Sequence, residues 1–442
     1  MKSLILSCGG SPEPLIFCIN DYNPDFICFL CSNDSIDIAN DIAKTCNLSD
    51  NQFTLKVVEN HESLEDSFAK SREIINELKK EHSSVHVDFT GGTKPMVAGL
   101  VLAAIGENCT YSYIGSQNSQ SRDKNGLGVV QDGFELIKNQ RDPYDVFAVL
   151  EFEKGMDFFN KYQFEAAKFN FKQASEKLEL DESREIAELL TYIMDVYDSW
   201  DKFNNLYNKK PIKTAFYNIV SKIEESKTLK EYFVENYPKF YHQLKLNHEF
   251  LEIKISRKGL IKMDDVKYYL PDLLNNAYRR IEEGKYDDAV ARLYRSIELI
   301  AQVGLTDKGI IKSRVLADNK EFKIDLNKIS QLDNFEVKTF IYELFEYERA
   351  IQYGKSHFGI GSDKSFQLLS KFDVDYATDY LNDKELKTNI GSRNGSILAH
   401  GLNPISKKKA NKLYSQVLSY SKRAFPDLEK YMSMSEFPKF EW

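Results

Sequence analysis

Arg393, Asn394 and His400 bring three side chains suited to phosphate chemistry into one short segment, RNGSILAHG at residues 393–401. On an ideal helix seven residues turn through about 700°, so Arg393 and His400 would share one face roughly 10 Å apart along the axis. That separation suits a phosphodiester held between them. Arginine binds phosphate through a planar, permanently charged group, and histidine exchanges a proton near neutral pH. The alternative is an ordinary pair of surface residues, which chance often produces at this spacing.

An arginine and an asparagine followed by a histidine resemble the signature of HEPN nucleases. The resemblance implies that Arg393 and His400 are the essential catalytic residues. In that family an asparagine usually follows the arginine directly, as Asn394 does here, and we expect Asn394 to position the histidine or the phosphate. The match covers only residues 393–401, so the function needs support from a second, independent feature of the chain.

Two other groups of polar residues have both a structural and a functional interpretation. Arg295, Glu298 and Gln302 share one face of a predicted helix. They either contact each other along the helix or face a catalytic cleft. A run of lysines after the motif is either a solvated helix face or a set of phosphate contacts, and its members are Lys407, Lys408, Lys409 and Lys412.

A second candidate site lies near the amino end, where the segment TGGTKPM at residues 90–96 follows an apolar run. Its two glycines let the backbone approach a ligand, and the free amides of a helix start favour an anion. Thr93 is a natural N-cap for the helix that follows, and Lys94 adds a positive charge. The Walker A pattern GxxxxGK[ST] is absent, so this turn does not indicate triphosphate hydrolysis.

A similar turn, GGSP at residues 9–12, follows the first apolar run of the chain. If both runs are parallel strands, the two turns meet above the carboxyl ends of the strands, where open sheets bind ligands. Ser32 and Asn33 follow the second apolar run and would lie at the rim. The predicted ligand-binding residues are therefore Gly9, Gly10, Ser11, Pro12, Ser32, Asn33, Thr90, Gly91, Gly92, Thr93, Lys94 and Met96.

The first 140 residues alternate between strand-like and helix-like patterns, which is typical of a parallel sheet covered by helices on both faces. Short apolar runs predict strands at residues 4–8, 26–31, 53–58, 85–89 and 111–114. Helical patterns between them occupy residues 36–46, 64–80 and 95–107. We therefore predict a Rossmann-like domain over residues 1–141.

Beyond Asp142 the chain shows long stretches with helical periodicity, such as residues 147–177 and 184–202. Residues 161–167 and 285–291 both resemble the turn of a helical hairpin. Their offset of 124 residues is too long for a solenoid repeat. We predict a helical connector over residues 142–255 and a terminal helical domain over residues 256–442, so the expected fold class is α/β followed by all-α.

The composition, with 42% apolar and 29% charged residues in 442, is that of a soluble protein of two or three domains. No apolar run approaches the roughly 20 residues that cross a bilayer, so a cytoplasmic location is expected. All six cysteines lie in the first quarter of the chain, and Cys28 and Cys31 lie in an apolar run. We therefore expect buried free thiols and no metal site. Because the net charge is −8, a nucleic-acid enzyme of this composition must concentrate positive charge locally.

The apolar strand with its TGGTKPM turn, together with the GGSP turn, resembles a CARF domain, the CRISPR-associated Rossmann fold. A CARF domain followed by a HEPN domain is the arrangement of the ancillary ribonucleases of type III CRISPR systems. The resemblance implies a homodimer that is activated by a cyclic oligoadenylate, tetra- or hexa-adenylate, bound across two CARF domains. It also implies metal-independent cleavage of single-stranded RNA with no further cofactor.

Our leading hypothesis from the sequence is a cyclic oligoadenylate-activated endoribonuclease that leaves a 2′,3′-cyclic phosphate. The alternative is a nucleotide-sensing binding protein whose helical part recruits a partner, with Arg393 and His400 in structural roles. In a third hypothesis the CARF domain is also a ring nuclease that slowly cleaves its own ligand. Thr90, Thr93 and Lys94 have suitable chemistry for that reaction, but nothing in the sequence distinguishes binding from cutting.

Overall fold

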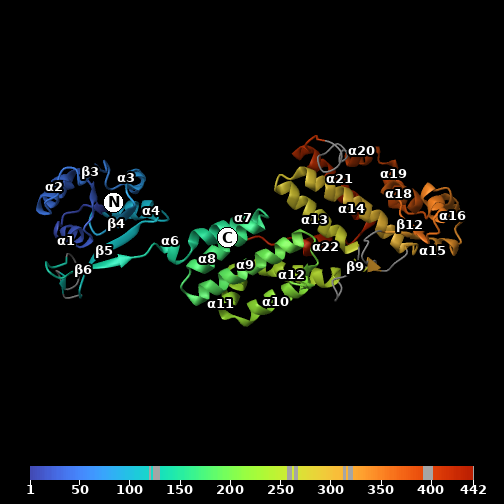
Figure 1. Cartoon of the computed structure of the whole chain (residues 1–442), viewed down its shortest axis with the longest axis horizontal. Helices are drawn as coiled ribbons and strands as arrows, with labels where there is room; N and C mark the ends of the chain where they lie inside the picture. Colours follow the sequence, from blue (N-terminus) through green and yellow to red (C-terminus); the bar gives the residue numbers. More distant parts are fainter. Residues whose placement is uncertain are drawn as a thin grey trace. The chain divides into compact units, whose positions relative to one another are not determined.

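A computed structural model gives the fold of residues 1–118, 121–122, 130–255, 261–262, 267–311, 315–316, 322–391 and 402–441 (Figure 1). The chain divides into two compact units. One comprises Met1–Glu151 with Glu176–Leu180, and the other comprises Phe152–Ser175 with Asp181–Trp442. Among the described helices, none is both long enough and apolar enough to cross a membrane.

The amino-terminal unit is built around a six-stranded sheet with the order β3-β2-β1-β4-β5-β6. Neighbouring strands are parallel except for β6, which runs antiparallel to β5. Leu4, Ile5 and Leu6 of β1 are all fully buried, so helices must cover both faces of the sheet. The strands are β1 (Lys2–Ser7), β2 (Phe26–Cys31), β3 (Phe53–Val57), β4 (Ser84–Asp88), β5 (Thr110–Ser116) and β6 (Glu135–Gln140).

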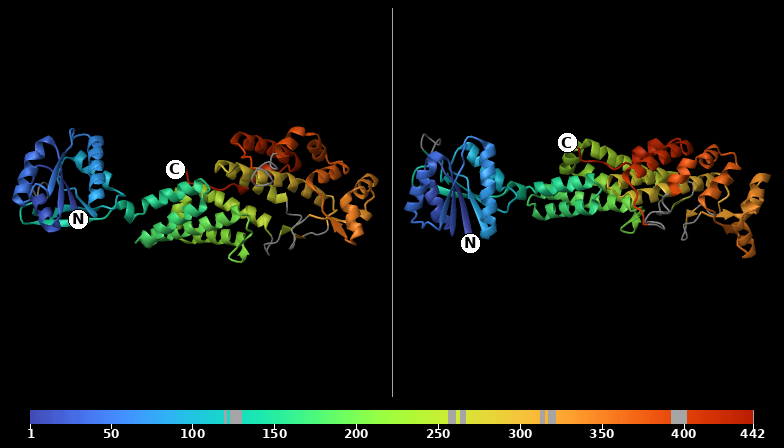
Figure 2. Two further views of the ribbon diagram at one scale, coloured as in Figure 1. Left: turned by 45° about the horizontal axis from the view of Figure 1, so that its top comes forward. Right: turned by 90° about the horizontal axis from the view of Figure 1, so that it is seen from above.

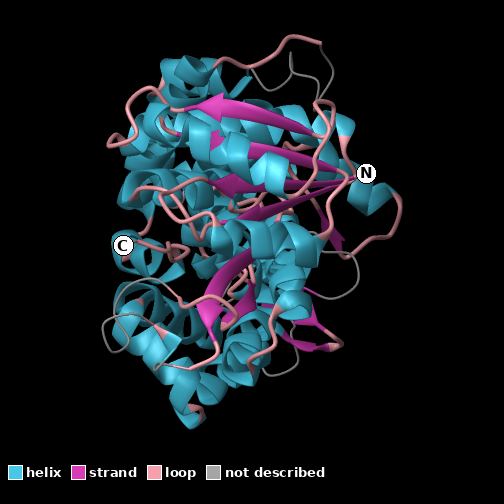
Figure 3. Cartoon of the chain, turned by 90° about the vertical axis from the view of Figure 1, so that its left-hand side faces the viewer, coloured by secondary structure: helices cyan, strands magenta, loops and turns pink. Residues whose placement is uncertain are grey.

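Helices lie on both faces of this sheet, as Figures 2 and 3 show. On one face Ile75 and Leu100 join a cluster with Val87 of β4, and on the other face Leu15 and Ile42 join a second cluster. The helices of this unit are α1 (Glu13–Tyr22), the 3-10 turn η1 (Asn33–Ser35), α2 (Ile36–Thr45), α3 (Leu64–Glu81), α4 (Lys94–Ala104) and the short α6 (Pro143–Val146).

Strand β1 lies between β2 and β4, so the strand order reverses direction at β1. Open parallel sheets bind ligands at such a switch point, beyond the carboxyl ends of the strands. The chain leaves β1 at residues 9–12 and leaves β4 at residues 89–93. The fold therefore brings the two predicted glycine turns to the same edge of the sheet.

The second unit begins with a group of helices around an aromatic core. Phe159, Tyr197, Trp200 and Phe240 are almost completely buried there, and Phe159 contacts Tyr197 with ring centroids 5.4 Å apart. The elements are α7 (Val149–Asn160), α8 (Phe164–Lys177), α9 (Asp181–Asp201), β7 (Leu206–Tyr207), β8 (Lys210–Pro211), α10 (Ile212–Glu225), α11 (Lys227–Lys230), the π-helical turn η3 (Glu231–Asn236) and α12 (Pro238–Lys254).

The remaining helices of this unit form a second core. This part of the chain also has two short strand pairs, β9 with β10 and β11 with β12, and Ile324 of β11 and Phe358 of β12 belong to the core. The elements are β9 (Ile261–Lys262), α13 (Tyr269–Glu282), α14 (Tyr286–Asp307), β10 (Val315–Leu316), β11 (Ile324–Asp325), α15 (Leu326–Ser330), α16 (Phe335–Tyr342), α17 (Phe345–Gln352), β12 (His357–Phe358), α18 (Ser362–Ser370), α19 (Asp375–Asn382), α20 (Lys384–Gly391), α21 (Lys407–Ala424) and α22 (Leu428–Ser435).

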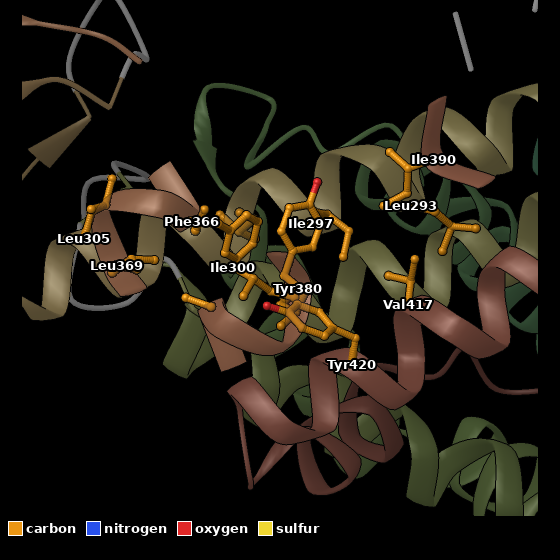
Figure 4. Close-up of a cluster of buried hydrophobic side chains, with 14 of the residues drawn as sticks. Leu293, Ile297, Ile300, Leu305, Phe366, Leu369, Tyr380, Ile390, Val417 and Tyr420 are labelled. Carbon is orange, nitrogen blue, oxygen red and sulfur yellow. The ribbon is translucent and has the colours of Figure 1, made fainter. Parts of the chain in front are cut away.

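Helix α14 lies at the centre of this second core (Figure 4). Its Ile297 and Ile300 meet Phe366 of α18 and Tyr380 of α19, whose rings stack at 4.0 Å. Tyr420 of α21 donates a hydrogen bond to the Tyr376 carbonyl at 2.5 Å, so its hydroxyl is satisfied inside the core. Apolar packing thus fixes α14, α19 and α21 relative to one another.

The two cores of this unit are joined by buried ion pairs between α9, α12 and α13. Lys254 binds the Asp272 carboxylate, and Arg279 and Arg280 bind Asp201 at 2.8 and 2.5 Å. All five side chains are less than a tenth exposed. Because each charge has an opposite partner, the network avoids the cost of an isolated buried charge.

The predicted fold class is confirmed: a Rossmann-like parallel sheet is followed by helical structure. Both predicted hairpin turns are also confirmed, since α7 ends at Asn160 before Phe164 and α13 ends at Glu282 before Tyr286. The further division at residues 141 and 255 stays a prediction.

Candidate functional site

A cavity of about 260 Å³ opens where β1 and β4 end. Six of the predicted ligand-binding residues lie on its wall, in the two glycine turns: Gly9, Gly10, Ser11, Thr90, Gly91 and Gly92. The wall also includes Tyr113, Ile114 and Arg122 from β5 and the segment that follows it. The described part of the wall therefore combines backbone amides, hydroxyls and the Arg122 guanidinium.

Glycine is required in these turns because they pack directly against each other. A side chain at Gly91 would overlap the Ser7 carbonyl oxygen, and one at Gly9 would come within 2.7 Å of the Gly92 nitrogen. Gly92 also has a φ of +92°, which side chains rarely tolerate. The Ser7 hydroxyl donates to the Gly91 carbonyl at 2.5 Å and holds the turns together.

A buried carboxylate shapes the turn after β4. Asp88 accepts a hydrogen bond from the Thr90 amide at 3.0 Å and from the Ser112 hydroxyl at 2.6 Å. Burial raises the pKa of Asp88, and the hydrogen bonds from Ser112 and Thr90 oppose that shift. The Thr90 hydroxyl oxygen accepts from the Ile114 amide at 2.7 Å. The turn is thus positioned by contacts on both sides of Thr90.

Arg122 is a cavity residue that sequence reasoning missed. Its Nε donates to the Ser116 hydroxyl and its Nη2 donates to the Tyr113 hydroxyl, each at 3.2 Å. The Tyr113 ring in turn stacks on Phe89 at 5.9 Å. The guanidinium is therefore held at the wall, where a phosphate would meet a permanent positive charge.

The other six predicted ligand-binding residues do not line this cavity. Thr93 caps α4, as predicted: its hydroxyl accepts from the Met96 amide at 3.4 Å and donates to the His61 carbonyl at 2.6 Å. Lys94 is exposed and Met96 is fully buried in the core. The remaining three lie near the starts of α1 and η1: Pro12, Ser32 and Asn33. The ligand-binding role of all six stays a prediction.

Arg393, Asn394 and His400 lie outside the described residues. The structure does describe both ends of their segment. Before it, Asn389 of α20 donates to Gln416 of α21 at 2.8 Å. After it, the Ile405 amide donates to Asp287 of α14 at 3.3 Å, and Ile405 is buried. Both ends are thus tied to the core helices α14 and α21.

The polar row on α14 makes contacts along its own helix. Arg295 donates to Gln302 at 2.8 Å and lies 3.6 Å from Glu298. Burial lowers the pKa of Arg295. These contacts support the structural interpretation of the row.

The lysines at the start of α21 are exposed, and Lys412 forms an ion pair with Glu385. Cys28 and Cys31 are buried free thiols, as predicted. Within the part of the chain that the structure describes, no three His, Cys, Asp or Glu side chains are grouped so as to hold a metal ion.

Comparison with known proteins supports the prediction of a HEPN domain in the carboxy-terminal part of the chain. Residues 259–424 match the family model of the Csm6 HEPN domain. Among solved structures, Enterococcus italicus Csm6 bound to cyclic hexa-2′-fluoro-hexa-dAMP is 13% identical, with 99% of each chain covered and a TM-score of 0.42. Can2 from Sulfobacillus thermosulfidooxidans in complex with cyclic tetra-adenylate is 12% identical over 48% of this chain and 70% of that chain, with a TM-score of 0.23. No curated protein matches.

The matched segment contains the Arg393–His400 motif and follows the Rossmann-like unit, in the domain order expected from the sequence. The predicted HEPN resemblance is therefore confirmed: over residues 259–424 this chain matches the family of the Csm6 HEPN domain.

Proposed function

We propose that this protein is a cytoplasmic endoribonuclease of type III CRISPR antiviral defence that cleaves single-stranded RNA when a cyclic oligoadenylate binds its amino-terminal domain. The observation that carries the proposal is the family match over residues 259–424, which includes Arg393, Asn394 and His400. The glycine-turn cavity supplies the second, independent feature that the short motif needed.

In the proposed reaction the 2′-hydroxyl of RNA attacks its own adjacent phosphate. The 2′-oxygen forms a bond to phosphorus, the bond to the 5′-oxygen of the next nucleotide breaks, and the products are a 2′,3′-cyclic phosphate and a free 5′-hydroxyl. His400 moves a proton or hydrogen-bonds the reacting oxygens, and Arg393 stabilises the charge that develops on the phosphoryl oxygens. Asn394 positions the histidine or the phosphate. Because the substrate provides the nucleophile, these groups suffice without a metal-bound hydroxide.

The activator site is the cavity between the two glycine turns. Its amides, hydroxyls and Arg122 suit an anionic nucleotide. A volume of about 260 Å³ is at the small end for a ligand site and far below the size of a cyclic tetra- or hexa-adenylate. In the proposal, one copy of the chain holds part of the ring and a second copy completes the site in a homodimer.

The test uses the full chain, a labelled single-stranded RNA and a panel of cyclic oligoadenylates. We expect cleavage that depends on one ring size and products that end in a 2′,3′-cyclic phosphate, identified by mass spectrometry. Chromatography of the nucleotide after incubation shows in the same experiment whether the ring is also cut. Tight nucleotide binding without RNA cleavage under any of these conditions would support the non-catalytic alternative and refute the proposal.

A further inference from the structure

A hollow of about 580 Å³ lies on the second unit, over the strand pair β11–β12 and helix α17. Positively charged side chains dominate its wall, with Lys323 from the start of β11, Arg349 from α17 and Lys355 from the turn before β12. His357 and Phe358 of β12 complete the surface. Neither of the two sites described above includes these residues.

Among the described residues of this wall, the one carboxylate is paired with a lysine. Glu346 accepts two hydrogen bonds from Lys364, at 2.7 and 2.8 Å. The pKa of Glu346 is lowered: burial acts to raise it, and the Lys364 ammonium and a backbone hydrogen bond outweigh that effect. Arg349 and Lys355 thus place two exposed positive charges at the hollow, in a chain whose net charge is −8. A nucleic-acid enzyme of this composition must concentrate positive charge locally, and these two side chains contribute to such a surface.

An exposed aromatic ring lies close to two of these cations. Tyr353 is 62% exposed, and the Arg349 guanidinium and the Lys355 ammonium each lie 6.0 Å from its ring centroid. The backbone fixes this arrangement at the end of α17. The amides of Tyr353 and Lys355 donate to carbonyls of α17 at 3.2 and 2.8 Å, and Gly354 turns the chain with a φ of +62°. The last turn of α17 and the turn after it thus bring the ring and both charges into one small region.

The chemistry of this surface favours a single nucleic-acid strand. Guanidinium and ammonium groups bind phosphates, and an exposed ring stacks on an unpaired base, the combination by which proteins hold single strands without sequence preference. A small anion is a poorer fit because Tyr353, Arg349 and Lys355 are exposed, whereas small-molecule sites bury most of their ligand. A polymer gains affinity from several such contacts at once.

We propose that Arg349 and Lys355 on the wall of the hollow, together with the adjoining Tyr353 ring, form a non-catalytic binding site for single-stranded RNA, which holds the substrate while another part of the strand is cut. This inference goes beyond the proposed function because it assigns RNA contacts outside the Arg393–His400 motif. It concerns binding, so it is tested without any cleavage.

The experiment measures binding of a fluorescent 2′-O-methyl RNA 20-mer to the full chain by anisotropy, over a range of salt concentrations. The 2′-O-methyl groups remove the nucleophile, so the probe stays intact whichever residues are catalytic. The test variant carries Arg349→Glu and Lys355→Glu. The matched control carries Lys227→Glu and Lys230→Glu, two exposed lysines of α11 in the same unit. Both variants change the net charge by the same amount.

The expected result is a specific loss in the test variant. Losing two phosphate contacts should make the negative slope of the log association constant against log salt concentration shallower by about 1.4. It should also weaken binding several-fold, while the control variant binds much as wild type does. Tyr353→Ala should weaken binding roughly tenfold through lost stacking, with little change in the salt slope. Circular dichroism confirms that each variant remains folded.

Equal affinity and equal salt slope in test and control variants would overturn the inference. So would an altered oligomeric state in light scattering with unchanged RNA affinity, since the surface would then be a protein contact. Failure of the proposed function gives a different pattern. In that case wild-type protein does not cleave ordinary RNA, yet the test variant still loses affinity for the probe.

Discussion

The Thr90 hydroxyl oxygen accepts a hydrogen bond from the Ile114 amide at 2.7 Å, which ties the glycine turn after β4 to strand β5. Thr90→Val keeps the shape of the side chain but leaves this partly buried amide without its partner. We expect the variant to lose about 1–3 kcal/mol of unfolding free energy and to bind cyclic oligoadenylate more weakly. Thermal unfolding and calorimetric titration measure the two effects. Thr90→Ser retains the oxygen and serves as the control, and a Val variant as stable as the Ser variant would contradict the assignment.

Arg122 provides the guanidinium on the wall of the same cavity. We expect Arg122→Ala to raise the Kd for cyclic oligoadenylate roughly 10- to 100-fold, because a hydrogen bond to a charged group is lost. The control is Tyr113→Phe, which removes one acceptor of Arg122 but keeps the ring that stacks on Phe89. Its effect on affinity should be smaller. Unchanged affinity in Arg122→Ala would show that the ligand does not reach this wall.

His86 makes the stability of the amino-terminal unit depend on pH. It lies under Tyr22, and its Nδ1 and Nε2 contact Thr110 and Ser112 at 2.7 and 2.9 Å. Burial lowers the pKa of His86 from 6.5 to about 4. The unfolded chain therefore binds this proton at a higher pH than the folded chain does. The stability that neutral His86 contributes is complete above about pH 6.5 and is lost as the pH falls toward 4.

The expected loss from His86 alone approaches about 3 kcal/mol at the acid end of that window. Asp88 acts in the opposite direction. Burial raises its pKa, so the ionised carboxylate destabilises the folded state, and protonation at lower pH removes that destabilisation. Proteolysis in urea at pH 7 and pH 5, read from peptides of β4, measures the stability of this unit. His86→Asn should lose less stability between the two pH values than wild type. Equal losses would refute the role of His86.

The ion pair between Lys254 and Asp272 tests how the two cores of the second unit are joined. Burial lowers the pKa of Lys254, which the nearby Asp272 opposes. Lys254→Met leaves the buried Asp272 carboxylate with the Trp200 indole as donor at 2.9 Å and with Arg279 as its nearest cation at 4.0 Å. We expect this variant to lose about 3–5 kcal/mol of unfolding free energy. The double variant Lys254→Met with Asp272→Leu should lose clearly less unfolding free energy than Lys254→Met alone, as measured by urea unfolding. If the losses of the two single variants simply added up in the double variant, a direct pairing would be contradicted.

Much of the fold was predictable because its signals are local. Apolar runs marked the five parallel strands within a residue or two, and the glycine turns were found from their spacing after two of those runs. Gly9 and Gly91 reach the same cavity because parallel strands end at a common edge. The hairpin turns around Tyr162 and Lys285 were also recognised from short motifs.

Other features depend on contacts between distant parts of the chain. Strand β6 is mostly exposed, so it has no continuous apolar run. Arg122 lies on the segment between β5 and β6, and its place at the cavity depends on contacts with Ser116 and Tyr113 of β5. Phe437 and Phe440 pack into the core of helices α7 to α12 from the far end of the chain. The two-residue strands of the second unit carry no periodic pattern at all. Such placements follow from tertiary packing, which residue spacing does not encode.

The most direct test of the central claim is a time course of RNA cleavage by the full chain at saturating cyclic oligoadenylate, comparing wild type with His400→Ala. The matched control is His242→Ala, an exposed histidine of α12. Loss of the proton-transfer group should slow cleavage by at least about 100-fold while nucleotide binding stays unchanged, and the control should cleave at the wild-type rate. Cleavage by His400→Ala at the wild-type rate would contradict the account.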